Sequence, residues 1–289
     1  MKHERPFDYL TATGLIALHV GFLIGVVYGR VRGFYLESFI LAALFAIGGS
    51  LGTTLGYHRM LTHKSFSCRS LVVRRALIFF AGLLQNASSW IANHRAHHAH
   101  ADTFQDPHSP YWPYPGGIAG AWWSHMGWLF WKYQAPQHIC DHADLQNADV
   151  VWENRWHAFI VTAGFILPFF LGGVIGLRKG MWSFFSYGFD SLLIAGAIRS
   201  CAILHLICSI NSLGHMVGWK LKGRPTQKSS SRNNPFLALI TFGEGNHAVH
   251  HQYPGSAHIG FWDPAWPLIV LGEKINIFSE IHHPREVSP

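Results

Sequence analysis

The chain has 289 residues, of which 49% are hydrophobic and 13% are Asp, Glu, Lys or Arg, and its mean hydropathy is +0.15. Charged residues make up about 25% of an ordinary soluble domain, so this composition excludes a disordered or fibrous chain and indicates a membrane protein. The net charge of +7 fits the basic loops of a membrane protein, and we expect no nucleic-acid partner. The 21 histidines, nearly as many as the 22 Lys and Arg together, indicate metal binding or proton transfer.

Four stretches are apolar and long enough to cross about 30 Å of hydrocarbon as helices, which takes about 20 residues each. These membrane spans are expected over residues 9–29, 38–57, 158–177 and 191–214. Short breaks at residues 30–33 and 178–190 would join them as two hairpins. A soluble protein with four buried core helices is the alternative, but such helices rarely run 20 residues without a charge. A shorter apolar run, residues 71–84, is expected to form a helix at the membrane interface.

An even number of spans places both termini and the long segment between the second and third spans on one side. This side carries 17 Lys and Arg, against four in the two hairpin breaks, so it is expected to be cytoplasmic. We expect the membrane to be a bacterial inner membrane. Residues 58–157 and 215–289 are too long for loops and are expected to fold together as a helical cap. The prediction is an all-α integral membrane protein whose residues 1–289 form one domain.

Histidines form three clusters on the predicted cytoplasmic side: His58–His63 (HxxxxH), His94–His98 (HxxHH) and His247–His251 (HxxHH). Residues i, i+3 and i+4 share a helix face, so each HxxHH is expected to present three imidazoles to one volume, whereas HxxxxH spreads its two by about 140°. Asn211–His215 adds a same-face pair at the end of the fourth span. One HxxxxH alone is more simply a solvent-facing pair, but nine histidines in four such segments indicate two metal ions. Spacing alone does not name the metal.

Further motifs surround these clusters. In chain order, the set is His58–His63 with Lys-Ser-Phe, His94–His98, Asp106-Pro-His108, Trp-Trp-Ser-His125-Met-Gly-Trp128, Asn211–His215, and Gly243-Glu-Gly-Asn-His247-Ala-Val-His-His251-Gln-Tyr-Pro254. Over residues 40–275 this set resembles, in order and spacing, the membrane fatty-acyl desaturases of the stearoyl-CoA and bacterial delta-9 type. The resemblance implies a non-haem di-iron enzyme that uses O2 to insert a cis double bond in a saturated acyl chain. Two electrons would come from a separate donor such as ferredoxin, rubredoxin or cytochrome b5.

The resemblance also implies a ligand set. Its members are His58, His63, His94, His97, His98, Asn211, His215, His247, His250 and His251. By the family pattern, one iron would be held by His58, His63, His98 and His251, with Asn211 acting through a water, and the other by the remaining five histidines. Four neighbours are expected to support the ligating rings: Asp106, His125, Glu244 and Asn246.

An apolar tunnel would choose which carbons react. The residues expected to line it are Ala46, Ser50, Thr54, Trp90 and Ile207. Helix packing and membrane-interface anchoring are the simpler explanations for a small-residue stripe and for a tryptophan, respectively.

The substrate carrier is left open by the sequence. Ala92-Asn93 precedes the second cluster, where the animal acyl-CoA enzymes have an Arg-Asp pair. An acyl-lipid, an acyl-carrier protein and acyl-CoA are therefore all considered as the form in which the acyl chain is bound. Membrane lipid is expected as a further partner. Candidate docking charges for an anionic carrier or headgroup are Arg74, Arg75, Lys220, Lys222 and Arg224.

Other functions are considered beside desaturation. An acetylenase or terminal desaturase acting on a carrier-bound chain, and a lipid hydroxylase or alkane oxygenase, would use the same histidine motifs. The HExxH motif of zinc hydrolases is absent. A metal transporter or sensor would need ligands within the spans, where the sequence places His19, Arg199 and His205.

Overall fold

The computed structural model describes residues 5–83, 85–133, 135, 139, 142–221 and 229–283. Two of the candidate docking charges, Lys222 and Arg224, lie outside the described residues. The helices are α1 (Tyr9–Arg32), α2 (Leu36–Leu51), η1 (Gly52–Thr62), α3 (Leu71–Ala81), α4 (Ala87–His100), α5 (Gly117–His125), η2 (Gly127–Phe130), α6 (His142–Leu145), α7 (Ala148–Gly176), η4 (Leu177–Lys179), α8 (Met181–Ser191), η5 (Leu192–Ile198), α9 (Arg199–Met216), α10 (Pro235–Ile240), α11 (His247–Gln252) and α12 (Trp266–Lys274). Strands β1 (Ser67–Cys68) and β2 (Phe278–Ser279) form one short antiparallel pair.

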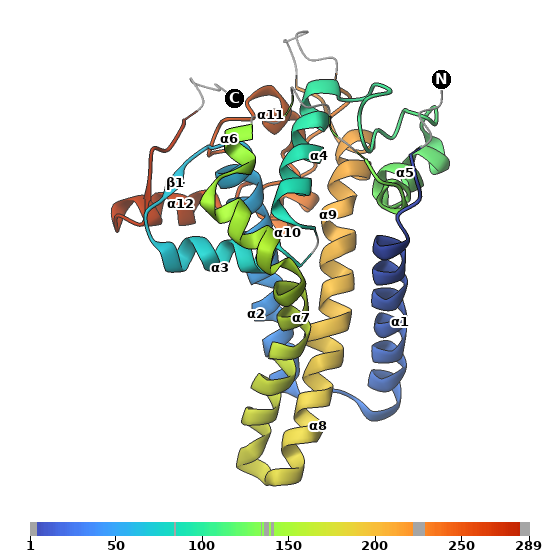
Figure 1. Cartoon of the computed structure of the whole chain (residues 1–289), viewed down its shortest axis with the longest axis vertical. Coiled ribbons are helices and arrows are strands. Elements are labelled where there is room, and N and C mark those ends of the chain that lie inside the picture. Colours follow the sequence, from blue (N-terminus) through green and yellow to red (C-terminus); the bar gives the residue numbers. More distant parts are fainter. Residues whose placement is uncertain are drawn as a thin grey trace.

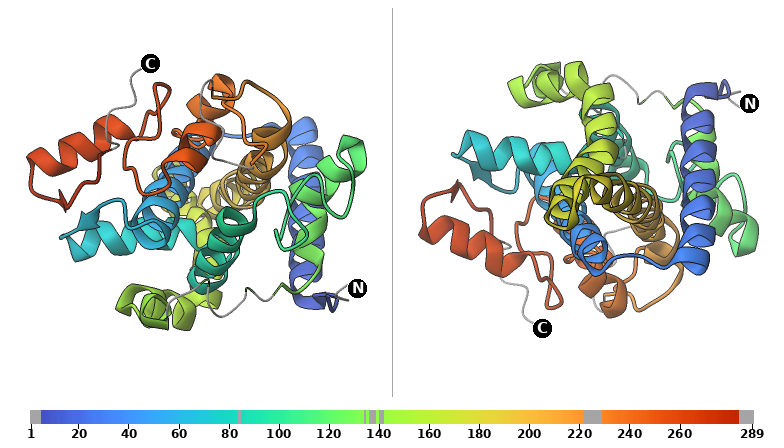
Figure 2. Two further views of the ribbon diagram at one scale, coloured as in Figure 1. Left: turned by 90° about the horizontal axis from the view of Figure 1, so that it is seen from above. Right: turned by 90° about the horizontal axis from the view of Figure 1, so that it is seen from below.

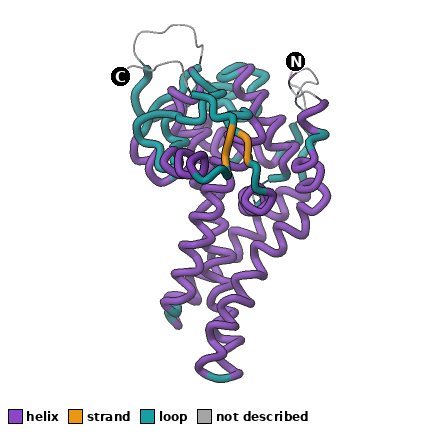
Figure 3. Tube along the Cα trace, turned by 90° about the vertical axis from the view of Figure 1, so that its left-hand side faces the viewer, coloured by secondary structure: helices purple, strands orange, loops and turns teal. Residues whose placement is uncertain are grey.

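Four helical segments are long and apolar enough to cross a membrane, which confirms the predicted all-α membrane fold. They are Tyr9–Arg32, Leu36–Thr62, Ala148–Lys179 and Met181–Met216. They run alongside one another, with α7 packed against α8 and α1 packed against η5 and α9, and a helical cap covers one end of them (Figure 1). The described ends of the chain both lie at the cap, and the α7–α8 turn lies at the far end. Figure 3 shows the same division, with helices in the spans and most loops in the cap.

The second hairpin is tighter than the sequence predicts. The expected break over residues 178–190 is almost entirely helical, because the chain turns at Gly180 and helix α8 starts at Met181. Gly180 has φ +111°, a conformation that residues with a Cβ rarely adopt. Asp190, one of the polar residues that suggested a break, has a partner inside the fold: its carboxylate accepts the backbone N–H of Tyr35 at 3.0 Å, just before α2.

The second span continues past its predicted end at Tyr57. Its last eleven residues form a π-helical segment, η1, which carries His58 and ends immediately before His63. A second π-helical segment, η5, joins α8 to α9 without a break. π-Helical turns are uncommon and occur mainly at functional sites.

The cap packs on the spans through α3 and the C-terminal segment. Helix α3, the predicted interfacial helix, lies across the spans (Figure 1), and its backbone approaches η1 closely at Gly52. Strand β1, just before α3, pairs with β2, which follows α12; seen from above, α3 and α12 lie side by side (Figure 2). Inside the cap, buried Arg59 of η1 binds both carboxylate oxygens of buried Asp263 at 2.9 Å. This pair fixes η1, and with it His58, against the C-terminal part of the cap.

Candidate metal centre

The nine predicted histidines converge at the cap end of the spans, on η1 and the residue after it, α4, α9 and α11. They form two groups in which the potential ligand atoms lie within 4.8 Å of one another. The first group is His58, His63, His94, His98 and His250, and the second group is His97, His215, His247 and His251. Four distant segments of sequence thus meet in one place.

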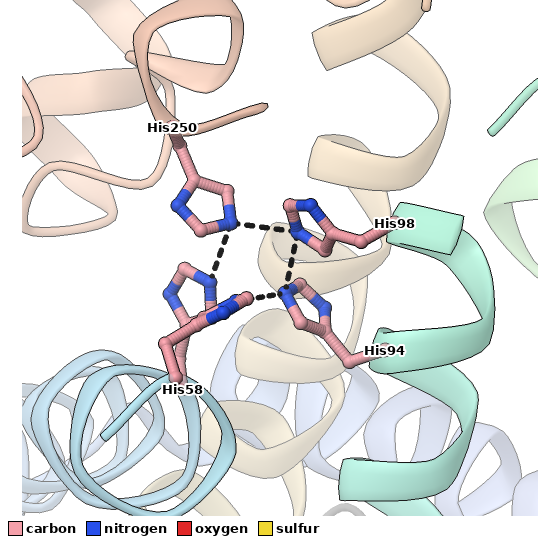
Figure 4. A group of neighbouring side chains, drawn as sticks. His58, His94, His98 and His250 are labelled. Atoms are coloured by element: carbon pink, nitrogen blue, oxygen red, sulfur yellow. Dashed lines mark hydrogen bonds between the residues drawn. The ribbon is translucent and has the colours of Figure 1, made fainter. Parts of the chain in front are cut away.

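In the first group, the rings face one another through their Nε2 atoms. The Nε2 of His250 lies 2.9 Å from that of His58 and 2.8 Å from that of His98. The His94 Nε2 lies 3.0 Å from that of His98 and 2.9 Å from that of His63. Figure 4 shows how the rings of His58, His94, His98 and His250 point toward a common centre.

In the second group, the four Nε2 atoms form a closed ring with sides of 2.9 to 3.2 Å. The Nδ1 of His97 binds the carboxylate of Asp106, and the Nδ1 of His215 binds the Ser230 hydroxyl. A neutral imidazole that donates through Nδ1 has only a lone pair at Nε2. The Nε2 atoms of His97 and His215 nevertheless face each other at 3.2 Å. Hydrogen bonds therefore do not satisfy the side between His97 and His215, whereas one cation at the centre of the ring would bind the Nε2 lone pairs of four neutral imidazoles.

The division of the ligands differs from the one predicted. His94 and His250 belong with His58, and His251 belongs with His97. The reason is helix geometry: residues four apart are turned by only about 40°, so each i, i+4 pair stays together, while the histidine between them points to the other group. The expectation that each HxxHH presents all three rings to one volume is therefore wrong.

The predicted separation of His58 and His63 by about 140° is also wrong. Both rings belong to the first group, with their centroids 4.9 Å apart. The backbone N–H of His63 donates to the His58 carbonyl at 3.1 Å, the i→i+5 hydrogen bond of a π-helix. The wider π-helical turn brings residues five apart to the same side, which an α-helical projection of HxxxxH does not anticipate.

Two of the predicted supporting residues each hold the ring of one of the nine histidines. Buried Glu244 accepts from His58 Nδ1 at 2.8 Å and also accepts the hydroxyl proton of Thr54. Buried Asp106 accepts from His97 Nδ1 at 2.9 Å. Such partners fix the tautomer and orientation of a metal-binding imidazole and raise its basicity. Each group of histidines therefore has its own carboxylate.

The other two predicted supporting residues have different contacts. His125 contacts His205, which is not one of the nine histidines, and the hydroxyl of Ser212. The Asn246 side chain donates to the Trp262 carbonyl at 2.7 Å, next to the start of α11. The roles predicted for His125 and Asn246 therefore do not match their contacts, because sequence proximity to a motif does not fix the direction of a side chain.

Three supporting contacts were not predicted. Asp102 lies beside His215, with 3.4 Å between Oδ1 and Nδ1, and Ser230 binds the same Nδ1 at 3.1 Å. The ring of His108 stacks on that of His97 at 4.4 Å. The position of Asp102, four residues after the HxxHH motif, was the available signal for an acidic partner.

The electrostatics of the site favour neutral rings. Burial, reinforced by nearby positive charge, lowers the pKa of six histidines well below the usual value: His63, His94, His98, His247, His250 and His251. Burial also opposes charge on His97, but Asp106 and Asp102 outweigh it and raise the pKa of that ring. Neutral imidazole is the form that binds a metal, so most of the ligands are ready at neutral pH.

The remaining predicted residues surround the centre. Asn211 lies one helical turn before His215 on α9 and is half-buried, and its role through a water stays a prediction. Of the tunnel residues, Thr54 and Ser50 are buried, while Ala46, Trp90 and Ile207 are half-buried. The Trp90 ring lies nearly parallel to that of His94, 6.2 Å away.

A cavity of about 450 Å³ lies beside α4. Its α4 wall consists of Gln85, just before the helix, with Ser88, Ser89, Ala92 and Asn93. The segment after α5, including Lys132, and Asp8 and Thr11 at the start of α1 also line it. The predicted docking charges Arg74 and Arg75 both bind Asp149, at 2.5 and 3.1 Å, so these two cations have a structural partner.

Known proteins resemble this chain over most of its length. A sequence profile described as fatty acid desaturase matches residues 37–259. An acyl-CoA C20 Delta5-desaturase of Anemone leveillei is 32% identical over 251 residues, covering 85% of this chain and 73% of the relative. An sn-1 stearoyl-lipid 9-desaturase of Anabaena variabilis is 30% identical over 283 residues, covering 90% of this chain and 91% of the relative. A hex-5-enoyl-(acyl-carrier protein) acetylenase of Moorena producens is 30% identical over 260 residues, covering 85% and 76% respectively.

Proposed function

Because the chain belongs to the fatty acid desaturase family and is therefore a membrane oxidoreductase of acyl chains, we propose that its nine histidines hold two non-haem iron ions and that O2 is its co-substrate. The observation that supports this proposal is the closed ring of four Nε2 atoms in the second group, 2.9 to 3.2 Å apart, an arrangement that one cation at its centre would satisfy. Imidazole ligands suit iron, among other transition metals. Among these metals, the oxidation that the family carries out requires one that is redox-active, as iron is.

The proposed reaction converts a –CH2–CH2– unit, O2, two electrons and two protons into a cis –CH=CH– unit and two waters. Bound iron would supply the activation of O2, chemistry that no side chain performs on an unactivated C–H bond. The protein's own part is to hold neutral imidazoles in place. Glu244 and Asp106 orient His58 and His97, and burial keeps bulk water from the rings.

We propose that the saturated acyl chain lies in an apolar tunnel that reaches the centre along Ala46, Ser50, Thr54, Trp90 and Ile207. Two contacts support this path: Thr54 binds Glu244, and Trp90 stacks on His94, so both residues lie next to the first group. A tunnel of fixed depth would select the reacting carbons by position, since neighbouring methylenes have nearly equal reactivity.

The cavity beside α4 is the proposed entrance for the carrier. The relatives act on acyl-CoA, acyl-lipid and an acyl-carrier protein, according to their names. The cavity lining holds one acidic residue, Asp8, and one basic residue, Lys132, besides the uncharged α4 wall. The absence of a cluster of cations in this lining favours a lipid or a carrier protein over the phosphates of CoA. Membrane assays with the same acyl chain on each carrier decide this point: turnover of acyl-CoA alone would contradict the preference.

We further propose that residues 1–289 form one domain with the cap and both termini in the cytoplasm of a bacterial cell, where a separate protein such as ferredoxin, rubredoxin or cytochrome b5 supplies the electrons. The charge difference between the two sides supports this orientation. A cysteine introduced at Lys179, in the α7–α8 turn, should react with an impermeant maleimide on intact spheroplasts. One introduced at exposed Glu280 should react only after lysis, and the reverse pattern would invert the topology.

A second outcome at the same centre is an acetylenase or a hydroxylase. The similarity to an acetylenase supports considering it. Expression in a host that lacks the double bond, followed by gas chromatography of the acyl chains, separates the products: a cis-alkene supports desaturation, whereas an alkyne or an alcohol would replace it.

The same assay tests the centre. We expect His98→Ala and His250→Ala to abolish the product while leaving membrane insertion unchanged, because each removes one ligand of the first group. His100→Ala is the matched control, since His100 is on the same helix as His98 but in neither group. Normal turnover in either ligand variant would contradict the assignment.

A further inference from the structure

A third cluster of potential ligands lies away from the nine histidines. His19 of α1 and His205 and Cys201 of α9 have their ligand atoms within 4.8 Å of one another. His205 is ten residues before His215 on the same helix, which places this cluster about 15 Å from the second group along α9. It lies within the membrane spans, where an ionisable residue suggests a functional site.

The two rings meet as the ligating rings of the main centre do. The Nε2 atoms of His19 and His205 face each other at 3.1 Å, within the 2.8 to 3.2 Å found in the two main groups. His19 Nδ1 donates to the Leu15 carbonyl at 2.7 Å, so its Nε2 carries a lone pair. A backbone carbonyl on the far nitrogen is the usual anchor of a metal-binding histidine.

The ring of His205 is anchored by a second imidazole. Its Nδ1 lies 2.9 Å from His125 Nε2, and His125 Nδ1 lies 3.1 Å from the Ser212 hydroxyl. When His205 donates its Nδ1 proton to His125 Nε2, His125 can donate its own Nδ1 proton to the Ser212 hydroxyl. The Nε2 atom of His205 then carries a lone pair that points at the cluster. His125, which does not touch the main centre, thereby gains a role as a positioning residue.

Close helix packing keeps the two sides of the cluster together. A Cβ on Gly21, two residues after His19, would lie 3.3 Å from the Cβ of Ala197. Cys201 is a buried free cysteine one helical turn before His205, so both project from the same side of α9. The close approach of the two helices beside the cluster therefore depends on a small residue at position 21.

We propose that His19, Cys201 and His205 form a mononuclear binding site for Cu⁺, separate from the histidine centre. A thiolate and two imidazoles are a soft donor set, of the kind that selects copper over iron. Cu⁺, one thiolate and two neutral rings have no net charge, whereas Zn²⁺ would leave one positive charge within the membrane and usually needs a fourth ligand. Binding displaces one proton from the Cys201 thiol and involves no electron transfer.

The test measures metals in the purified full chain in detergent, under reducing anaerobic conditions. After loading with Cu⁺ in the presence of a competing chelator, we expect one copper per chain in the wild type and nearly none in Cys201→Ser. Cys208→Ser, a buried cysteine on the same helix outside the cluster, should keep its copper. Iron per chain is measured in the same samples. A low iron content would contradict the di-iron assignment, whereas the copper content tests the site at Cys201.

Two further measurements do not depend on the ligand variant being well folded. Copper X-ray absorption of the wild type should show one sulfur and two nitrogen neighbours, and His125→Ala should lower Cu⁺ affinity by about 10- to 100-fold. A copper shell without sulfur, copper retained by Cys201→Ser, unchanged affinity in His125→Ala, or zinc in place of copper would each overturn the proposal.

Discussion

At the scale of single residues, Glu244 and Asp106 have the same role in the two groups of histidines. Each is a buried carboxylate that accepts the Nδ1 proton of one clustered histidine, His58 in the first group and His97 in the second. Burial alone would raise the pKa of each carboxyl, but the interaction with the histidine beside it, which includes the Nδ1 hydrogen bond, outweighs burial and lowers the pKa. Both carboxyls are therefore ionised at neutral pH and act as fixed acceptors.

Removing either acceptor should weaken metal binding by its own group. We expect Glu244→Ala and Asp106→Ala each to lower the affinity of one metal ion by about 10- to 100-fold, because the anchored ring loses its orientation. Titration with Fe²⁺ against a chelator measures this effect. Glu273→Ala, an exposed position on α12, is the control and should bind as the wild type does. Equal loss of both ions in each variant would contradict the pairing of one carboxylate with one group.

At the scale of elements, η1 explains why the sequence predicted which histidines converge but not how they are arranged. Residue type and spacing are local information, and they were enough to find the nine histidines. The direction of each ring depends on the helix type and on which neighbour packs against it. The π-helical turn that brings His58 and His63 together leaves no mark in the HxxxxH spacing.

The contact between η1 and α3 gives a test of this element. A Cβ on Gly52 would lie 2.6 Å from the Leu77 carbonyl oxygen and 2.7 Å from the Ala81 nitrogen, both backbone atoms. We expect Gly52→Ala to destabilise the protein by about 1–3 kcal/mol, because α3 must move away from the span. Thermal unfolding in detergent measures the change.

Gly49→Ala is the matched control in the same span. Its Cβ would lie 3.8 Å from Ile203, an ordinary van der Waals distance. Alanine is the better helix former by about 1 kcal/mol, so this variant should unfold at or above the wild-type temperature. Equal behaviour of the two variants would contradict the tight packing of α3 on η1.

At the scale of the whole molecule, hydropathy was sufficient to predict four spans, two hairpins and a cap. Those features follow from the free-energy cost of placing polar groups in hydrocarbon, which restricts every residue of a span. The exact hairpin turn was not predictable in this way, because Asp190 lies in a helix and is satisfied by a backbone N–H of α2. Long-range pairs such as Arg59 with Asp263 leave no local pattern either.

Bound metal should stabilise the whole fold. It would link η1, α4, α9 and α11, and a ligand present at 1,000 times its dissociation constant adds about 4 kcal/mol of stability. We expect removal of metal by a chelator to lower the unfolding temperature of the wild type, and re-addition of Fe²⁺ to restore it. His98→Ala should show a smaller drop. An unchanged unfolding temperature after complete metal removal would contradict this coupling.

The convergence of His58 and His250 in one group has a consequence for biosynthesis. The ribosome makes His58 long before it makes α11, and all four spans are translated before the last ligands exist. Until then, the early histidines would meet cellular metals as an incomplete set. Assembly of the centre must therefore come after insertion by the translocon, so a chain truncated between α9 and α11 should be integrated in the bilayer yet leave both groups incomplete, the first without His250 and the second without His247 and His251.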